Sequence, residues 1–155
     1  MAVRIGCQAV PMTETQERLA SLHSYLAYRD AAKALRWLES AFGFETVMEF
    51  PDDKGRILHS ELRLGGASII VFSAEEDYDR ATRKGETVGH GLYVSLPTQE
   101  AVDAVFASAI EAGATTVWKP ENTEWGNYRF RVDDLEGYEW TFGTHIPGEP
   151  QTDWS

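Results

Sequence analysis

His59 and Glu61 are the two residues whose types and spacing point to acid–base chemistry. They stand two positions apart in a stretch predicted to be a strand, and alternate residues of a strand lie on the same face of a sheet. An imidazole or a carboxylate in a cleft is a candidate general base, so either residue is a candidate catalytic group. The same pair also fits a solvated strand face without chemistry, and that alternative stays open at this point.

Trp125 and Tyr128 are candidates for a different role, the binding of a ligand. They lie in a segment rich in Gly and Asn that precedes a predicted strand, where an aromatic side chain has less reason to be buried. Pockets for small molecules are lined largely by aromatic and apolar side chains. Our hypothesis is that both residues line the mouth of a pocket, with burial in the core as the alternative.

Composition excludes several classes of function. The chain has 155 residues, with 14 Lys and Arg against 25 Asp and Glu, which gives a formal net charge of −11. A surface this acidic repels phosphate backbones and anionic lipids, so we expect a small molecule as the partner, not nucleic acid or a membrane. A single cysteine, Cys7, excludes an internal disulfide and a cysteine-based zinc site. Because no long apolar segment occurs near the N-terminus, we expect a cytoplasmic protein.

Two halves of the chain share one pattern of elements. In the first half, the periodicity predicts a helix between Asp30 and Gly43 and strands over 22–28, 44–50, 56–64 and 67–73. In the second half, it predicts a helix between Thr98 and Gly113 and strands over 90–96, 115–119, 129–132 and 139–143. Each half therefore follows the order β-α-β-β-β, and such an internal repeat is a strong indication of the fold.

The repeat predicts a single α+β domain made of two βαβββ modules. We expect a curved eight-stranded mixed sheet around a concave cleft, with the helices on the convex side. A ferredoxin-like sandwich is the alternative, but it does not need three consecutive strands after each helix. The predicted boundaries are a domain over 21–146, with module one at 21–73, a linker at 74–89 and module two at 90–146. The remainder is an N-terminal tail, 1–20, for which disorder is one expectation, and a C-terminal tail, 147–155.

Several segments resemble the glyoxalase/bleomycin-resistance/extradiol-dioxygenase (vicinal oxygen chelate) superfamily. They are Tyr28-Arg29-Asp30, Ala41-Phe42-Gly43-Phe44, His59-Ser60-Glu61-Leu62 with Gly65-Gly66, and the run from Trp125 to Trp140. The resemblance extends over about residues 23–145 and implies the paired βαβββ fold that the repeat predicts independently. It also implies a homodimer, since members of the superfamily often form dimers.

The resemblance further implies where a metal ion would bind. Metal-dependent members carry a His or Gln near the first strand of each module, and His23 and His90 match those positions. The carboxylate positions differ, because Ile70 and Thr141 stand there and neither is a useful ligand. Since catalytic metals usually have three protein ligands, we expect no cofactor. The alternative is a divalent metal held by His23, His90 and Glu61.

The residue pair Gly65-Gly66 predicts which side chains face the cleft. If it forms a two-residue turn, then Leu64 pairs with Ala67 and Glu61 pairs with Ile70. The alternation of side chains then places His59 and Glu61 on the cleft side, with Leu58 and Leu62 towards the helices. The predicted cleft-facing residues are His23, Tyr25, His59, Glu61, Ile70, Phe72, His90, Leu92, Glu139 and Thr141.

Three functions fit these expectations, and the fold alone does not choose between them. The first is a metal-free protein that binds a small aromatic, cationic compound, as the resemblance to bleomycin-resistance proteins implies. Its predicted ligand-binding residues are Tyr25, His59, Glu61, Phe72, Trp125, Tyr128 and Thr141. The second is a metal-dependent lyase, thiol transferase or dioxygenase that uses His23 and His90. The third is a metal-free enzyme in which His59 or Glu61 acts as the general base.

Overall fold

The computed structural model describes residues 20–150, so most of the two predicted tails lies outside the described residues. The elements of the first module are β1 (Ser24–Tyr28), α3 (Ala31–Phe42), β2 (Glu45–Pro51), β3 (Ile57–Leu64) and β4 (Ala67–Ser73). Those of the second module are β5 (Gly91–Ser95), α4 (Gln99–Glu111), β6 (Thr115–Asn122), β7 (Tyr128–Asp133) and β8 (Glu139–Gly143). The predicted β-α-β-β-β order is confirmed in both modules.

Both helices begin at the residues that the sequence predicts. The side chain of Asp30 accepts a hydrogen bond from the backbone N–H of Lys33 at 3.1 Å, and Thr98 does the same for Ala101 at 3.1 Å. Each bond satisfies one of the N–H groups that a first helical turn leaves without a partner. Helix α3 ends at Gly43, whose φ of 83° lies in the left-handed region that favours glycine.

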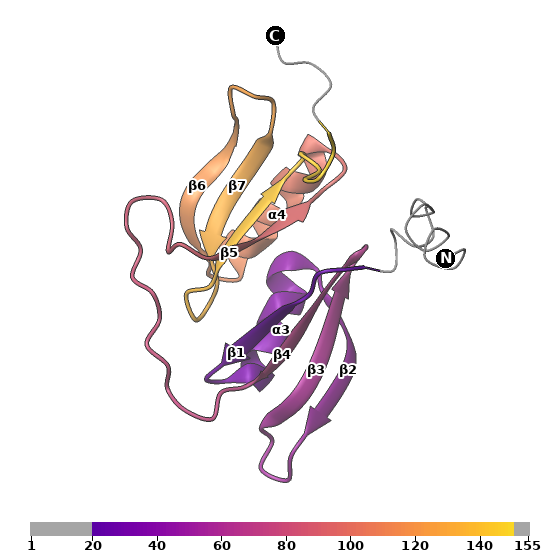
Figure 1. Ribbon diagram of the computed structural model, residues 1–155, viewed down its shortest axis with the longest axis vertical. Coiled ribbons are helices and arrows are strands. Elements are labelled where there is room, and N and C mark those ends of the chain that lie inside the picture. The colour runs from indigo at the N-terminus through magenta and orange to yellow at the C-terminus, as the bar shows by residue number, and fades with distance from the viewer. Residues whose placement is uncertain (1–19, 151–155) are drawn as a thin grey trace, which may run out of the picture.

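The eight strands divide into two four-stranded sheets, in the orders β1-β4-β3-β2 and β5-β8-β7-β6. In each sheet the first and last strands of the module pair in parallel, and the other pairs are antiparallel. Helix α3 packs on the first sheet and α4 on the second, and the two helices also contact each other. Figure 1 shows that each helix covers one face of its sheet, so the opposite face of each sheet is left open.

The hairpin between β3 and β4 confirms the register predicted from its two glycines. Leu64 pairs with Ala67, and Glu61 pairs with Ile70. Leu62 is fully buried, whereas His59 and Glu61 are only partly buried on the other side of the strand.

The predicted position of Leu58 is wrong. Its side chain is 65% exposed, and its neighbour Ile57, at 2% exposure, packs in the core. The pairing of β2 with β3 shifts register between Phe50 and Pro51, and this irregularity changes the alternation at the start of β3.

A buried carboxylate joins the two modules. Asp134, in the loop before β8, accepts hydrogen bonds from the hydroxyl of Tyr28 at 2.6 Å and from Nε1 of Trp140 at 3.0 Å. Its other oxygen accepts the backbone N–H groups of Glu136 and Tyr138, both at 3.0 Å. Burial raises the pKa of Asp134 above its ordinary value, although these four donors act against the rise. Tyr28 belongs to module one and Asp134 to module two, so this bond crosses the junction.

Aromatic packing around the same junction forms one core shared by the modules. The ring of Phe42, at the end of α3, lies 4.9 Å from that of Trp140 and 4.8 Å from that of Phe142. Nε1 of Trp37 donates to the carbonyl of Ala112 at 2.8 Å, which ties α3 to the end of α4. Trp140 and Phe142 are completely buried, which confirms that they are core residues.

The connecting segment, residues 74–89, is held against both modules by arginines. Arg80 donates to the carbonyl of Ala27 at 2.8 Å and to the hydroxyl of Tyr138 at 2.6 Å. Arg83 donates to the carboxylate of Glu139 at 2.9 Å and also pairs with Asp133. Among residues 20–150, no helix is long and apolar enough to cross a membrane.

We expect the substitution Tyr28→Phe to lower the free energy of unfolding by about 1–3 kcal/mol, because it removes one donor from the buried carboxylate of Asp134. The matched control is Tyr78→Phe. Tyr78 is 49% exposed, and its hydroxyl has no hydrogen-bond partner within residues 20–150. That change should stay within about 0.5 kcal/mol. Urea unfolding of the three proteins measures both effects, and equal losses for the two variants would contradict the role given to the bond.

Candidate ligand-binding site

Apart from Tyr128, the residues predicted to bind a ligand fall into two groups, one on the open face of each sheet. The first sheet carries Tyr25, His59, Glu61 and Phe72, together with His23 just before β1. The second sheet carries Trp125 and Thr141. His23 and Glu61 of the first group line one hollow, and Trp125 and Thr141 of the second group line another.

The first-sheet group surrounds a small hollow of about 250 Å³, lined by His23, Glu61, Ser68, Ile69 and Ile70. Nε2 of His59 lies 3.0 Å from Oε1 of Glu61, so the predicted pair is formed. Next to it, the rings of Tyr25 and Phe72 meet edge to face at 6.1 Å, and Tyr25 is 71% exposed. This face therefore presents an imidazole–carboxylate pair beside exposed aromatic surface.

The donor set on this face does not fit a catalytic divalent metal. His23 and His90 each stand one residue before the first strand of their module, as their predicted equivalence requires. His23 and Glu61 line the same hollow, but His90 does not. Both ring nitrogens of His23 already lie within hydrogen-bond distance of Ser21 or Ser68. Within residues 20–150, no group of three His, Cys, Asp or Glu side chains lies close enough to hold a metal ion.

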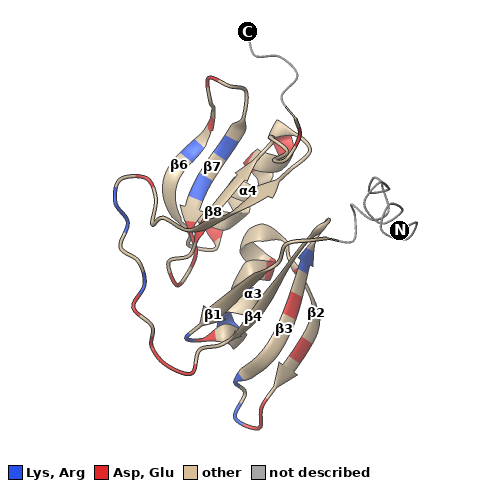
Figure 2. Ribbon diagram, in the orientation of Figure 1, with Lys and Arg blue, Asp and Glu red and all other residues tan. Residues whose placement is uncertain are grey.

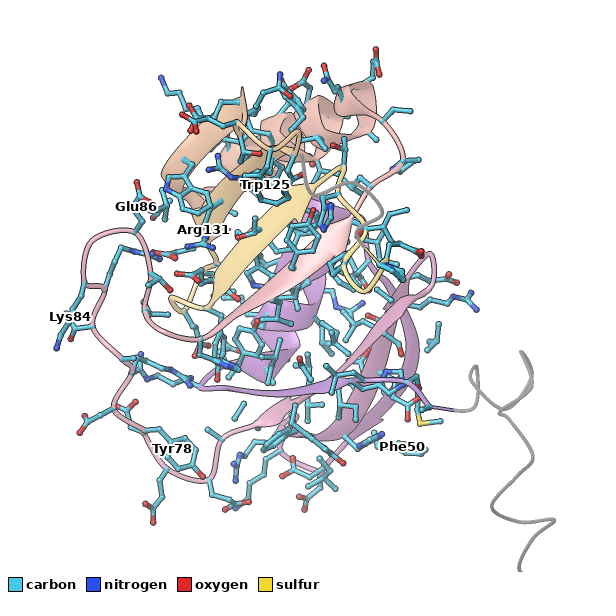
Figure 3. All side chains as sticks on the ribbon, turned by 45° about the horizontal axis from the view of Figure 1, so that its top comes forward. Phe50, Tyr78, Lys84, Glu86, Trp125 and Arg131 are labelled. Atoms are coloured by element: carbon cyan, nitrogen blue, oxygen red, sulfur yellow. The ribbon has the colours of Figure 1, made fainter. Side chains whose placement is uncertain are left out.

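The second-sheet hollow is larger, at about 400 Å³, and lies over β6, β7 and β8. Three residues of its floor are neighbours across the sheet, because Tyr93 pairs with Thr141 and Thr141 pairs with Arg131. The complete lining is Tyr93, Trp118, Thr123, Trp125, Asn127, Arg129, Arg131, Thr141, His145 and Pro147. In Figure 3, the side chains of Trp125 and Arg131 are seen over the open face of this sheet.

Two arginines lie over one tryptophan in this hollow. The guanidinium carbons of Arg129 and Arg131 are 4.1 Å and 3.9 Å from the centre of the Trp118 ring, which is within cation–π range. Nε of Arg131 donates to the hydroxyl of Thr141 at 2.8 Å. Arg129 donates to the carboxylate of Glu121 at 3.2 Å. Stacking and hydrogen bonds together fix both guanidinium groups in place.

The other end of the hollow is shaped by close packing around Asn127, which is 2% exposed. Its side-chain oxygen accepts the backbone N–H of His145 at 3.0 Å, and the hydroxyl of Tyr93 donates to the carbonyl of His145 at 2.8 Å. A Cβ at Gly143 would lie 2.5 Å from that oxygen and 2.6 Å from the hydroxyl of Tyr93. Only glycine fits there. The ring of Trp125 meets that of His145 at 5.1 Å, almost perpendicular.

The connecting segment is held next to the hollow by contacts that involve its own Glu86 and Glu139 of β8. The carbonyl of Glu86 accepts a hydrogen bond from Arg131 at 2.6 Å, and Figure 3 shows the two side by side. The carboxylate of Glu139, 4% exposed, accepts from Arg83 at 2.9 Å and from the backbone N–H of Val88 at 3.1 Å. Burial alone would raise the pKa of Glu139, but these donors and the charge of Arg131 outweigh it and the pKa is lowered.

Two sequence predictions for this sheet need correction. The hydroxyl of Tyr128 donates to Asp103 of α4 at 2.6 Å, so Tyr128 lies on the helix side and not at a pocket mouth. Leu92 pairs with Trp140 and packs against the core, and Tyr93 occupies the open face in its place. The reason is that β5 is shifted by one residue relative to the predicted alternation. Such a shift moves every side chain of a strand to the opposite face of the sheet.

Sequence reasoning missed Trp118, Arg129 and Arg131. The sequence could have indicated Arg131, because this residue pairs with Thr141 and partners across a sheet share a face. It could not have indicated Trp118, because the pairing of β6 with β7 shifts register on both sides of that residue.

A comparison with family models identifies the family of this chain. The profile of the Glyoxalase/Bleomycin resistance protein/Dioxygenase superfamily matches residues 19–142. An uncharacterised protein of Mycobacterium bovis is 29% identical over 127 residues, which cover 81% of this chain and 84% of that protein.

Two solved structures illustrate the same similarity. TioX from Micromonospora sp. ML1 superposes with a TM-score of 0.65 at 31% identity, over 82% of this chain and 99% of that one. FosX, a fosfomycin resistance protein of Listeria monocytogenes solved with Mn(II), superposes with a TM-score of 0.62 at 14% identity, over 83% of this chain and 91% of that one. The likeness to FosX shows the fold alone.

We expect Glu139→Gln to lower the free energy of unfolding by about 1–3 kcal/mol at pH 7, because Arg83 and Arg131 lose a charged acceptor. A carboxyl whose folded pKa is below its unfolded value of about 4.3 stabilises the protein above that value. The difference between the two proteins should therefore shrink as the pH falls below about 4. Urea unfolding between pH 7 and pH 3 measures it. Glu75→Gln, at a carboxylate that is 80% exposed in the same segment, is the control and should show no comparable difference.

Proposed function

The chain belongs to the glyoxalase/bleomycin resistance protein/dioxygenase superfamily, and from that premise we propose that it binds a small molecule in the sheet-lined hollow of its second module, without a catalytic metal. The observation that carries the proposal is the hollow itself. Its volume of about 400 Å³ lies in the ordinary range of ligand pockets, about 300–1,000 Å³.

The hollow also has the chemical character of a ligand pocket. Trp118, Trp125 and Tyr93 supply flat aromatic surface, and Thr141 and Asn127 supply polar groups at fixed positions. Such a combination holds a ligand by apolar contact and orients it by a few hydrogen bonds. Trp125 and Thr141 are the predicted ligand-binding residues that belong to this hollow. Tyr25, His59, Glu61 and Phe72 form a second proposed contact surface, on the first sheet.

A homodimer is part of the proposal. The first sheet and its edges expose large apolar side chains, among them Leu22 at 95%, Tyr25 at 71% and Phe50 at 56%. Large exposed apolar side chains on a folded protein commonly mark an interaction site, and a second copy would remove those of this sheet from water. Light scattering at micromolar concentration should give twice the mass of the chain, and a monomer would contradict the dimer.

An enzyme that uses the first sheet is the second candidate. His59 and Glu61 lie within hydrogen-bond distance, the geometry of a general base with an orienting carboxylate. In the metal-dependent version, His23 and Glu61 share one hollow, and FosX was solved with Mn(II). His90 would have to join them from the other module.

The binding function is tested with chelator-treated protein whose tryptophans carry ¹⁵N in the indole ring. We expect neutral and charged naphthalene or quinoline fragments to shift the indole signals of Trp118 and Trp125. The signals of Trp140, which is buried, and of Trp37, which packs partly buried between the helices outside the hollow, should stay unchanged. The substitution Trp125→Ala should weaken the binding about tenfold, since stacking on an aromatic side chain contributes on the order of 1–3 kcal/mol. Tyr78→Ala, at an exposed aromatic residue outside the hollow, is the control. Fragments that bind without shifting either signal would place the site elsewhere.

The metal question has its own measurement. We expect calorimetric titration of the chelator-treated protein with zinc, nickel, manganese and iron(II) ions to show no submicromolar binding, because two neutral imidazoles leave most of the ion's water in place. Submicromolar binding that His23→Ala, His90→Ala or Glu61→Gln abolishes would favour the metal-dependent enzyme instead.

A further inference from the structure

We propose that the second-sheet hollow takes an aromatic carboxylate, a planar ring that carries a negatively charged group. The inference rests on the proposed function, because it names the class of ligand for the same hollow. It also replaces the cationic ligand that the resemblance to bleomycin-resistance proteins implies.

The lining of the hollow is basic. Its ten residues include two arginines and a histidine, Arg129, Arg131 and His145, and no aspartate or glutamate. The whole chain has 25 acidic residues against 14 basic ones. The basic lining is therefore a local feature of a chain that is acidic as a whole. Figure 2 shows basic residues along β6 and β7, whereas acidic residues mark the strands β2 and β3 of the first sheet.

The two arginines keep hydrogen-bond donors for a ligand. Arg129 uses one terminal nitrogen on Glu121, and Arg131 uses Nε on Thr141 and one terminal nitrogen on Glu86. That terminal nitrogen of Arg131 also lies 3.6 Å from the carboxylate of Glu139, an ion pair that leaves the other terminal nitrogen without an acceptor among the described residues. Their remaining N–H groups have no acceptor within residues 20–150, and none of those nitrogens is completely buried. The side chains are only 17% and 18% exposed, so these donors are poorly hydrated. A carboxylate is the acceptor whose planar shape matches a guanidinium group.

Two like charges held over one ring repel each other. Burial lowers the pKa of Arg131, and the neighbouring charges of Arg83 and Arg129 lower it further, although Glu139 acts in the opposite direction. An anion between Arg129 and Arg131 would offset this repulsion. A cationic ligand would add to it.

The side of the hollow opposite the arginines indicates that the ligand contains an aromatic ring. Trp125 is 65% exposed, and its ring meets that of His145 almost perpendicularly, so it offers aromatic surface on which another ring can stack. Tyr93 and Trp118 add further aromatic surface within the same lining. A flat ring between these side chains would place a carboxylate substituent next to the arginines.

The test uses three probes with the same ring and different charge: 2-naphthoate, 2-naphthamide and 2-naphthylmethylammonium. Calorimetric titration of the chelator-treated full chain should show naphthoate binding at least about tenfold more tightly than the amide, because charge-assisted hydrogen bonds are stronger than neutral ones. The ammonium probe should bind most weakly. Added salt should reduce the preference for naphthoate.

Variants assign the preference to this hollow. Arg129→Gln should bring the affinity for naphthoate close to that for the amide, and Arg129→Lys should keep part of the preference. Arg63→Gln, at an arginine of the first sheet that is 58% exposed, should leave the preference unchanged. Thermal unfolding of each variant shows that it is folded before its affinities are compared.

Each outcome separates the inference from the proposed function. If the three probes bind equally and Trp125→Ala weakens all of them, the hollow binds ligands and the inference about charge is wrong. Tighter binding of the ammonium probe than of naphthoate would also overturn the inference about charge. An unchanged preference in Arg129→Gln overturns the assignment to these arginines. If none of the probes binds at millimolar concentration, both the inference and the proposed role of this hollow are overturned.

Discussion

The bond between Tyr28 and Asp134 is the interaction on which the arrangement of the two modules depends. It links the end of β1 to the loop before β8, and it is buried, so it cannot be exchanged for water without a cost in free energy. The same carboxylate holds Trp140 in the core against Phe42 of the other module. A single acidic residue therefore positions both the backbone of its own loop and the shared aromatic core.

This shared core determines which surfaces are available for function. Because α3 and α4 pack against each other and against one face of each sheet, the opposite faces are left to meet a ligand or a partner. The connecting segment does not disturb this arrangement, since Arg80 and Arg83 hold it to residues next to the junction. The carbonyl of its Glu86 accepts a hydrogen bond from Arg131, so the segment that links the modules also helps to fix this arginine.

The sequence predicts the order of the helices and strands well, and it predicts less well on which face of a sheet each side chain lies. The difference has physical reasons. Caps such as Asp30 and the glycine pair at residues 65–66 act locally, so the helices and the first hairpin follow from them. The predicted facing of Leu58 is wrong because a local irregularity in the pairing of β2 with β3 changes the alternation. The predicted facing of Leu92 is wrong because it depends on the parallel pairing of β5 with β8, which is distant in the sequence. The position of Trp118 in the hollow depends on the register of β6, and the pairing of β6 with β7 shifts on both sides of this residue. The net charge of the chain also says little about the lining of one hollow, because most of its carboxylates lie elsewhere.

The two modules share a fold but present opposite chemistry, and Thr141 shows how. The resemblance places Thr141 where metal-dependent members of the superfamily carry a glutamate. Here its hydroxyl accepts a hydrogen bond from Nε of Arg131 at 2.8 Å, and the carboxylate that pairs with this guanidinium is that of Glu139, 3.6 Å away. A second carboxylate, at the place of Thr141, would also pair with Arg131 and would make the floor of the hollow acidic. The replacement of an anion by a neutral acceptor thus removes a metal ligand and, in the same step, leaves a positive charge facing the hollow.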